Sequence, residues 1–230
     1  MAALVPQSRI TVKPVFLISN LHGPPRQRSR DIFMTVLSRV RTRYLELLGH
    51  LDTFEIAIEA PLDVSVEWSS SVELDFTNNC VKVAIKSLLR QENYDQHTCP
   101  FIYACIMAGL ESLSLNGRGT TFNGKVNTGG GIALLPEGSL VDPNRCQAQM
   151  EHELGHTFGL LHPRADHAAF SDRIMSQHRN PNSPGLLSFE DYIILAHASR
   201  VFPRFGESRE DLRAHPCDNL AIQPPFFIGE

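Results

Sequence analysis

The order of the predicted elements indicates an α/β protein in which strands and helices alternate and pack as a sandwich. Residues 11–18 (TVKPVFLI) are rich in β-branched and aromatic residues, and residues 101–108 (FIYACIMA) form a short continuous apolar run. Both compositions are typical of buried strands. Residues 30–48 instead repeat apolar side chains at helical spacing. A smaller part, built mostly of loops, is expected to follow Gly159.

The first half of the chain should contain one further strand and one further helix. Residues 53–60 (TFEIAIEA) alternate polar and apolar side chains, which is the period of a half-buried strand. Residues 78–91 fit a helix, although their β-branched side chains would also fit a strand. Ser29 is a suitable N-cap and Gly49 a suitable C-terminal stop for the helix at 30–48.

The second half begins with a glycine-rich segment, residues 116–131, which is expected to form a loop. Residues 132–137 (IALLPE) predict a short strand. A capping-box-like start at Ser188 predicts a last helix that runs to about Val201. The Pro-rich tail, residues 203–230, has no predicted regular structure.

The best-defined helix lies between these segments. Asp142 is a suitable N-cap, and Pro143 suits the first helical position, where its missing N–H is no loss. The helix should run to about Thr157 or Phe158, because Gly159 is placed to stop it. One face carries large apolar residues at four-residue spacing and should pack into the core: Met150, Leu154 and Phe158.

The other face of this helix carries a metal-binding pattern, HELGHTFGLLH, which starts at His152. His152 and His156 are four residues apart, so their imidazoles project from one face and can reach one metal ion. Glu153 lies near enough to address a metal-bound water but not the metal itself. Gly159 can turn the chain sharply and bring His162 back as a third ligand.

Three neutral histidines leave a fourth position open for water, which is the pattern of a catalytic zinc site. Zinc lowers the pKa of that water to roughly 7, so that Glu153 can take its proton as general base. The hydroxide would then attack a peptide carbonyl. The sequence therefore predicts a zinc-dependent endopeptidase with one Zn²⁺ per chain.

The pattern from His152 to His162, followed by Ile174-Met175-Ser176, resembles the metzincin clan of zinc endopeptidases. The resemblance implies that Met175 lies beneath the metal as an apolar base, in a methionine turn. It also implies a twisted mixed sheet with a backing helix and an active-site helix, and a small irregular C-terminal subdomain with one helix. We expect a single catalytic domain over residues 1–230, divided into an upper part at 1–159 and a lower part at 160–230.

Within the clan the features are mixed. Pro163 after the third histidine is similar to serralysins, whereas the gap from His162 to Met175 is closer to adamalysins. No tyrosine closely follows Met175, so the tyrosine ligand of serralysins and astacins is not supported. We therefore assign the clan and no subfamily.

The family also implies where the substrate binds. The edge strand before the active-site helix pairs with an extended peptide, and this segment stands in its place: Gly131, Ile132, Ala133, Leu134 and Leu135. The alternative is that the segment is simply an internal strand. The expected partner is a protein or peptide substrate bound in extended form, and we expect a monomer.

Composition excludes some classes of partner. The formal net charge of −4 gives no indication of nucleic-acid binding, and no apolar run approaches the ~20 residues that span a bilayer. The five cysteines include no CxxC pair, so a cysteine zinc site is not expected. Residues 1–10 lack the core of a signal peptide. The family resemblance favours a secreted protein, and an intracellular protein is the alternative.

Two other functions fit the motif. One is a binding module that keeps the metzincin scaffold without catalysis, although the intact Glu153 argues against it. The other is a zinc amidohydrolase that acts on a non-peptide amide. An extended substrate-binding strand favours a peptide, and a closed pocket would favour a small molecule.

His162→Ala should reduce the zinc stoichiometry of the purified protein more than His167→Ala. The reason is that the turn at Gly159 directs His162, and not His167, toward the other two ligands. Metal analysis of both variants after dialysis checks this. Equal losses would contradict the choice of His162 as the third ligand.

Overall fold

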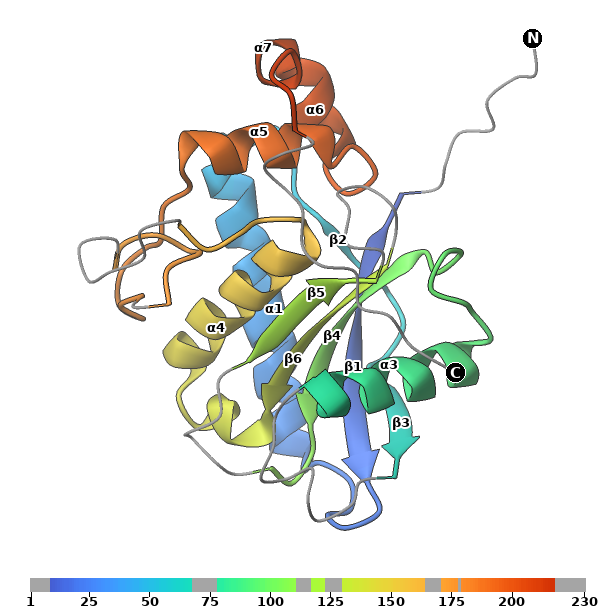
Figure 1. Cartoon of the computed structure of the whole chain (residues 1–230). Coiled ribbons are helices and arrows are strands. Elements are labelled where there is room, and N and C mark those ends of the chain that lie inside the picture. Colours follow the sequence, from blue (N-terminus) through green and yellow to red (C-terminus); the bar gives the residue numbers. More distant parts are fainter. Residues whose placement is uncertain are drawn as a thin grey trace, which may run out of the picture.

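The computed structural model shows, among the residues that it describes, a six-stranded sheet with helices on both faces (Figure 1). The described residues are 9–67, 78–110, 117–122, 130–163, 171–177 and 179–217. The mixed α/β fold class expected from the sequence is confirmed.

The sheet is parallel except at one edge. Its order is β2-β1-β4-β6-β5, and β3 follows β2 along the same side of β1. Strand β5 pairs antiparallel with β6, and the other pairs are parallel. The bounds are Thr11–Ser19 (β1), Glu55–Ile56 (β2), Leu62–Val66 (β3), Phe101–Met107 (β4), Arg118–Thr121 (β5) and Gly131–Pro136 (β6).

Side chains along each inner strand alternate between two hydrophobic cores, one on each face of the sheet. On β4, Ile102, Ala104 and Ile106 belong to one core, whereas Tyr103 and Cys105 belong to the other. This is the period-two alternation of a pleated strand, and here both faces are covered because both are apolar. The continuous apolar run at 101–108 is thereby explained.

Helices α1 and α4 cover the first face of the sheet, and α3 covers the second (Figure 1). The short C-terminal helices α5, α6 and α7 add apolar side chains to the same core as α1 and α4. The bounds are Gln27–Leu47 (α1), Asn78–Glu92 (α3), Pro143–Thr157 (α4), Phe189–His197 (α5), Pro203–Ser208 (α6) and Glu210–Arg213 (α7), with a 3-10 helix, η1, at Glu137–Val141. In the described part of the chain, no helix is both long and apolar enough to cross a membrane.

Helix α4 begins and ends as its sequence predicts. The Asp142 carboxylate accepts hydrogen bonds from the backbone N–H groups of Asn144 and Arg145, at 3.1 and 3.2 Å. Pro143 occupies the first turn. Past the end of the helix, Gly159 has a φ of +98°, a conformation that favours glycine. The apolar face at Met150, Leu154 and Phe158 is fully buried in the core, as expected.

Two strand predictions need correction. Residues 53–60 do not form one strand, because β2 has only two residues and β3 starts after Pro61. Proline lacks the N–H needed for continued pairing, so it separates the two. The expected loop at 116–131 contains the edge strand β5. Its glycines suggested a loop, but in a strand they allow close packing, as described below.

Three helix predictions also need correction: the start of one helix, the end of another, and the tail expected to lack helices. Helix α1 begins at Gln27, so Ser29 lies inside it and is not the N-cap. Helix α5 ends at His197 instead of Val201, because Ala198 has a non-helical ψ of 51°. The tail is helical at α6 and α7, so the described residues of the C-terminal part form three helices where one was expected.

The expected edge strand at 131–135 is an internal strand. Strand β6 pairs with β4 on one side and with β5 on the other, and all its residues are buried. Both sets of backbone groups are used by neighbouring strands, so this segment cannot accept an extended peptide. Strand β5, which the sequence did not indicate, forms that edge of the sheet.

The buried carboxylate of Asp52 joins the two ends of the described chain. It accepts hydrogen bonds from the Arg9 guanidinium at 2.9 Å and from the backbone N–H groups of Arg204 and Phe205, at 2.8 and 3.2 Å. The last two are the orphan donors at the start of α6. Nearby, Ile10 N–H donates to the Arg200 carbonyl at 2.9 Å.

Asp142→Ala should lower the free energy of unfolding by about 1 kcal/mol, because two N–H groups at the start of α4 lose their acceptor. Urea unfolding, followed by circular dichroism, measures the change. Asp142→Asn keeps an acceptor oxygen and serves as the control, with little loss expected. An equal loss in both variants would show that the side chain does not act as a hydrogen-bonding cap.

Candidate metal centre

Three histidine side chains converge at the C-terminal end of α4. His152 and His156 project from the same face of the helix, and the turn at Gly159 returns the chain so that His162 faces them. The Nε2 atom of His162 lies 3.0 Å from Nε2 of His152 and 3.1 Å from Nε2 of His156. The site thus gathers three ring nitrogens around one point.

The remaining ring nitrogens of two of these histidines face backbone carbonyls. Nδ1 of His152 lies 2.8 Å from the carbonyl oxygen of Ile174, and Nδ1 of His156 lies 2.9 Å from that of Leu160. A carbonyl oxygen only accepts, so each Nδ1 carries the hydrogen. In the neutral ring, Nε2 then presents its lone pair to the shared point, which is the tautomer that a metal ligand needs.

The third histidine contacts a side chain instead. Nδ1 of His162 lies 2.9 Å from the side-chain amide of Gln177. A half-turn of this amide places its oxygen, rather than its nitrogen, against the ring. The oxygen would accept the Nδ1 hydrogen and leave Nε2 of His162 free to bind a metal.

The geometry of this group fits zinc. Two nitrogens that each bind a tetrahedral zinc ion at about 2.05 Å lie roughly 3.3 Å apart. The two measured separations, 3.0 and 3.1 Å, are close to this value. In the described part of the chain, these three histidines form a cluster of metal-binding side chains whose ligand atoms all lie within 4.8 Å of one another. Imidazole nitrogen is also a donor that zinc prefers.

Glu153 is held beside the histidines in a buried position, with 7% of its surface exposed. Burial raises the pKa of its carboxyl group to about 8, against the opposing effect of the Arg118 cation. Burial also lowers the pKa of His156 to about 3, with help from His152 and His162. Both shifts favour neutral side chains, and a neutral imidazole is the form that binds a metal.

Met175 lies directly against the helix that carries the ligands. Its side chain is 1% exposed, and a Cβ atom added at Gly155 would come within 2.5 Å of its Sδ atom. Any residue larger than glycine at position 155 would therefore displace the Met175 side chain. Met175 thus packs against the ligand-bearing helix, and its role as the base of a metal site stays a prediction.

A buried ion pair holds the segment after Met175 to α4. Arg179 contacts the carboxylate of Glu151 at 2.5 Å and donates to the Ala148 carbonyl at 3.0 Å. Gln147 donates to the other Glu151 oxygen at 2.8 Å. Because Glu151 precedes His152, this network fixes the helix and the segment that supplies the Ile174 carbonyl relative to each other.

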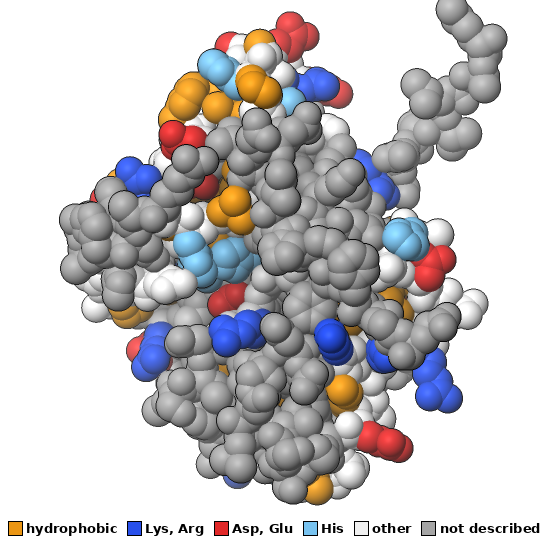
Figure 2. Space-filling model, viewed as in Figure 1, with side chains coloured by type: hydrophobic (Ala, Val, Ile, Leu, Met, Phe, Trp, Pro, Cys, Tyr) orange, Lys and Arg blue, Asp and Glu red, His pale blue; other side chains and the backbone are white. Residues whose placement is uncertain are grey.

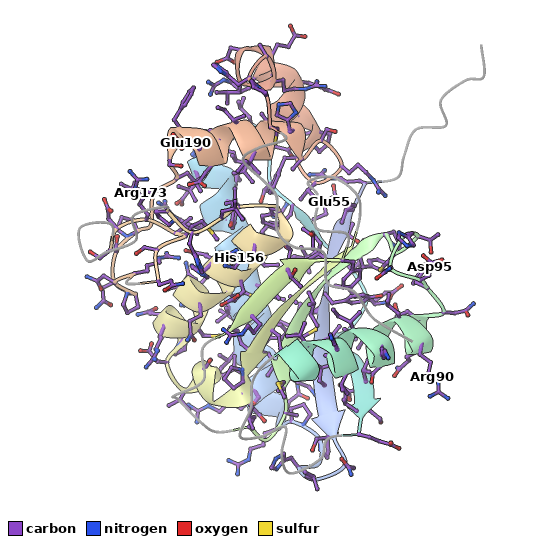
Figure 3. All side chains as sticks on the ribbon, in the orientation of Figure 1. Glu55, Arg90, Asp95, His156, Arg173 and Glu190 are labelled. Atoms are coloured by element: carbon purple, nitrogen blue, oxygen red, sulfur yellow. The ribbon has the colours of Figure 1, made fainter. Side chains whose placement is uncertain are left out.

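The histidines reach the surface on the face that α4 and β5 share. Figure 2 shows histidine side chains gathered there, with an acidic side chain next to them and Lys or Arg side chains just beyond. Figure 3 places His156 at the end of α4, above the sheet. The three histidines are each partly exposed, so a ligand can approach from solvent.

The structure brings the predicted ligands and Glu153 together, and their chemical roles stay predictions. His167, the alternative to His162 as third ligand, lies outside the described residues. No pattern in the sequence indicated a role for Gln177, Arg179 or Arg118. Their importance depends on contacts between segments far apart in the chain, and no spacing rule reports such contacts.

Comparison with known proteins supports the fold at low sequence identity. No protein-family model matches the chain, and no curated protein does. Among solved structures, OgpA from Akkermansia muciniphila is similar, with a TM-score of 0.55 and 17% identity over 82% of this chain and 60% of that chain. The chain thus spans less than two thirds of the length of OgpA. This likeness confirms the fold and does not extend to activity.

Two more distant structures are also similar. Archaemetzincin from Methanopyrus kandleri has a TM-score of 0.46 and 15% identity, over 84% of this chain and 98% of that chain. Metalloproteinase-II from Bacteroides fragilis has a TM-score of 0.39 and 13% identity, over 84% of this chain and 54% of that chain. With such low TM-scores, neither structure adds to the argument.

Gln177→Ala should weaken zinc binding by about tenfold or more, because His162 loses the partner that orients its ring. Competition with a chromogenic chelator measures the zinc dissociation constant. Gln177 is exposed, so the variant should keep its fold. Gln177→Glu supplies an acceptor oxygen without rotation of the amide and should retain zinc. Unchanged affinity in the Ala variant would show that the contact with His162 is incidental.

Proposed function

We propose that this protein is a zinc-dependent endopeptidase of the metzincin type. His152, His156 and His162 would hold one zinc ion per chain, and Glu153 would act as the general base. The proposal rests on one observation above all: three histidine Nε2 atoms converge beside a buried carboxylate. The sequence motif and the packing of Met175 against the ligand-bearing helix support it.

The bound zinc ion and Glu153 would have different roles in the hydrolysis of a peptide bond. A zinc ion bound at this site supplies a Lewis acid that polarises the substrate carbonyl and makes water easier to deprotonate. Glu153 takes the proton from the attacking water and passes it to the leaving amine. Its burial disfavours the charged form, so the carboxyl group readily holds the proton between these two steps.

Strand β5 is the element best placed to bind an extended peptide. Among the described strands it pairs only with β6, so it is the last strand on that side of the described sheet. A peptide could pair there by β-augmentation. The backbone of β5 also packs against Glu153, which would bring the scissile bond close to the general base.

The test is cleavage of a mixed peptide library by the wild-type protein and by Glu153→Ala, both loaded with zinc. We expect cleavage by the wild type and a loss of at least about 10²-fold in the variant, because the proton acceptor is gone. Mass spectrometry identifies the products, and metal analysis establishes equal zinc content in both proteins.

Other outcomes point elsewhere. Equal cleavage by both proteins would contradict the role of Glu153 as general base or reveal a contaminating protease. No cleavage of peptides by either zinc-loaded protein would favour a binding module. Hydrolysis of simple N-acyl amides, included as a second substrate panel, would instead indicate a zinc amidohydrolase.

A further inference from the structure

Arg118 is a positive charge at the start of the edge strand that lies over Glu153. Strand β5 begins at this residue, and its two flanking residues are glycines. A Cβ atom added at Gly117 would lie 2.6 Å from Oε1 of Glu153, and one added at Gly119 would overlap the backbone of Glu153. The backbone on both sides of Arg118 is therefore in contact with the general base of the proposed mechanism.

The guanidinium of Arg118 does not stabilise the fold through an ion pair with a described residue. The side chain is exposed, and the hydrogen bond that it makes is to the carbonyl of its neighbour Gly117, at 3.1 Å. No carboxylate of the described residues lies within ion-pair distance of it. By contrast, the arginines Arg9, Arg30, Arg43 and Arg179 each pair with a carboxylate.

Arg118 brings a positive charge next to Glu153, because the glycines on both sides of it lie against that residue. The chain as a whole has a net charge of −4, so this cation does not belong to a generally basic surface. A ligand that approaches the histidines along β5 meets it directly.

We propose that Arg118 is a specificity residue that selects peptide substrates with a carboxylate close to the scissile bond. The inference rests on the proposed peptidase function and adds the substrate class. A guanidinium offers donors in a planar fork that match a carboxylate, and such charge-assisted hydrogen bonds are stronger than neutral ones. The carboxylate could be an Asp or Glu side chain, or the free C-terminus of the peptide.

The experiment uses the zinc-loaded protein and paired fluorescent octapeptides with both ends blocked. In each pair one position is Asp or Asn, a third peptide carries Lys there, and this position moves along the peptide. A further pair differs only in a free or an amidated C-terminus. Cleavage and, separately, binding by fluorescence anisotropy are measured for the wild type, Arg118→Gln and Arg118→Glu.

Arg90→Glu is the matched control. It makes the same change in charge as Arg118→Glu, but on α3, which covers the opposite face of the sheet. Figure 3 shows Arg90 far from His156. Arg118 and Arg90 are both exposed, so neither variant should disturb folding, which circular dichroism checks.

We expect the wild type to favour the Asp peptide over its Asn partner by roughly tenfold at one position, or to favour the free C-terminus over the amide. Arg118→Gln should abolish this preference, Arg118→Glu should reverse it toward Lys peptides, and Arg90→Glu should keep it. No charge preference in either assay, or a preference that survives both Arg118 substitutions, would overturn the inference. Charge-dependent binding without cleavage would keep the Arg118 site but reject the peptidase.

Discussion

The position of the metal centre depends on the close packing of helix α4 against its neighbours at two glycines. At Gly119 the backbone of β5 meets the backbone of Glu153, and at Gly155 the helix meets the side-chain sulfur of Met175. A Cβ atom at Gly119 would force the two backbones apart, and one at Gly155 would displace the Met175 side chain. The helix therefore cannot slide or rotate without losing one of these contacts, and the histidine ring nitrogens are held with the accuracy that a metal site requires.

The segment that follows the third histidine belongs to the site although it supplies no ligand. Its Ile174 carbonyl sets the tautomer of His152, and its Arg179 neutralises the buried carboxylate of Glu151. Breaking such a buried pair leaves an unpaired charge and commonly costs about 3–5 kcal/mol. The metal centre therefore includes the residues that orient the histidine rings as well as the histidines themselves.

The sequence predicted the ligand group and the helix that carries it because their signals are local: caps at Asp142 and Gly159, and fixed spacing between His152, His156 and His162. It also predicted the central strands β1 and β4, whose apolar runs are unambiguous. It missed β5 and misplaced the edge of the sheet, because a strand next to Gly117 and Gly119 has the composition of a loop. Strand order and contacts such as that of Gln177 arise from packing, which no local pattern reports.

The Asp52 link has a consequence for the order of folding during synthesis. Asp52 accepts hydrogen bonds from Arg9, which lies 43 positions before it, and from Arg204, which lies 152 positions after it. In the aromatic core, Tyr44 and Phe158 both pack against Phe202. Contacts of such high sequence separation form late and slow the folding of a domain. A nascent chain that has just exposed its histidines to solvent therefore still lacks the helix that closes their core. Phe202, which completes this core, follows His162 by 40 positions and so leaves the ribosome after all three ligands.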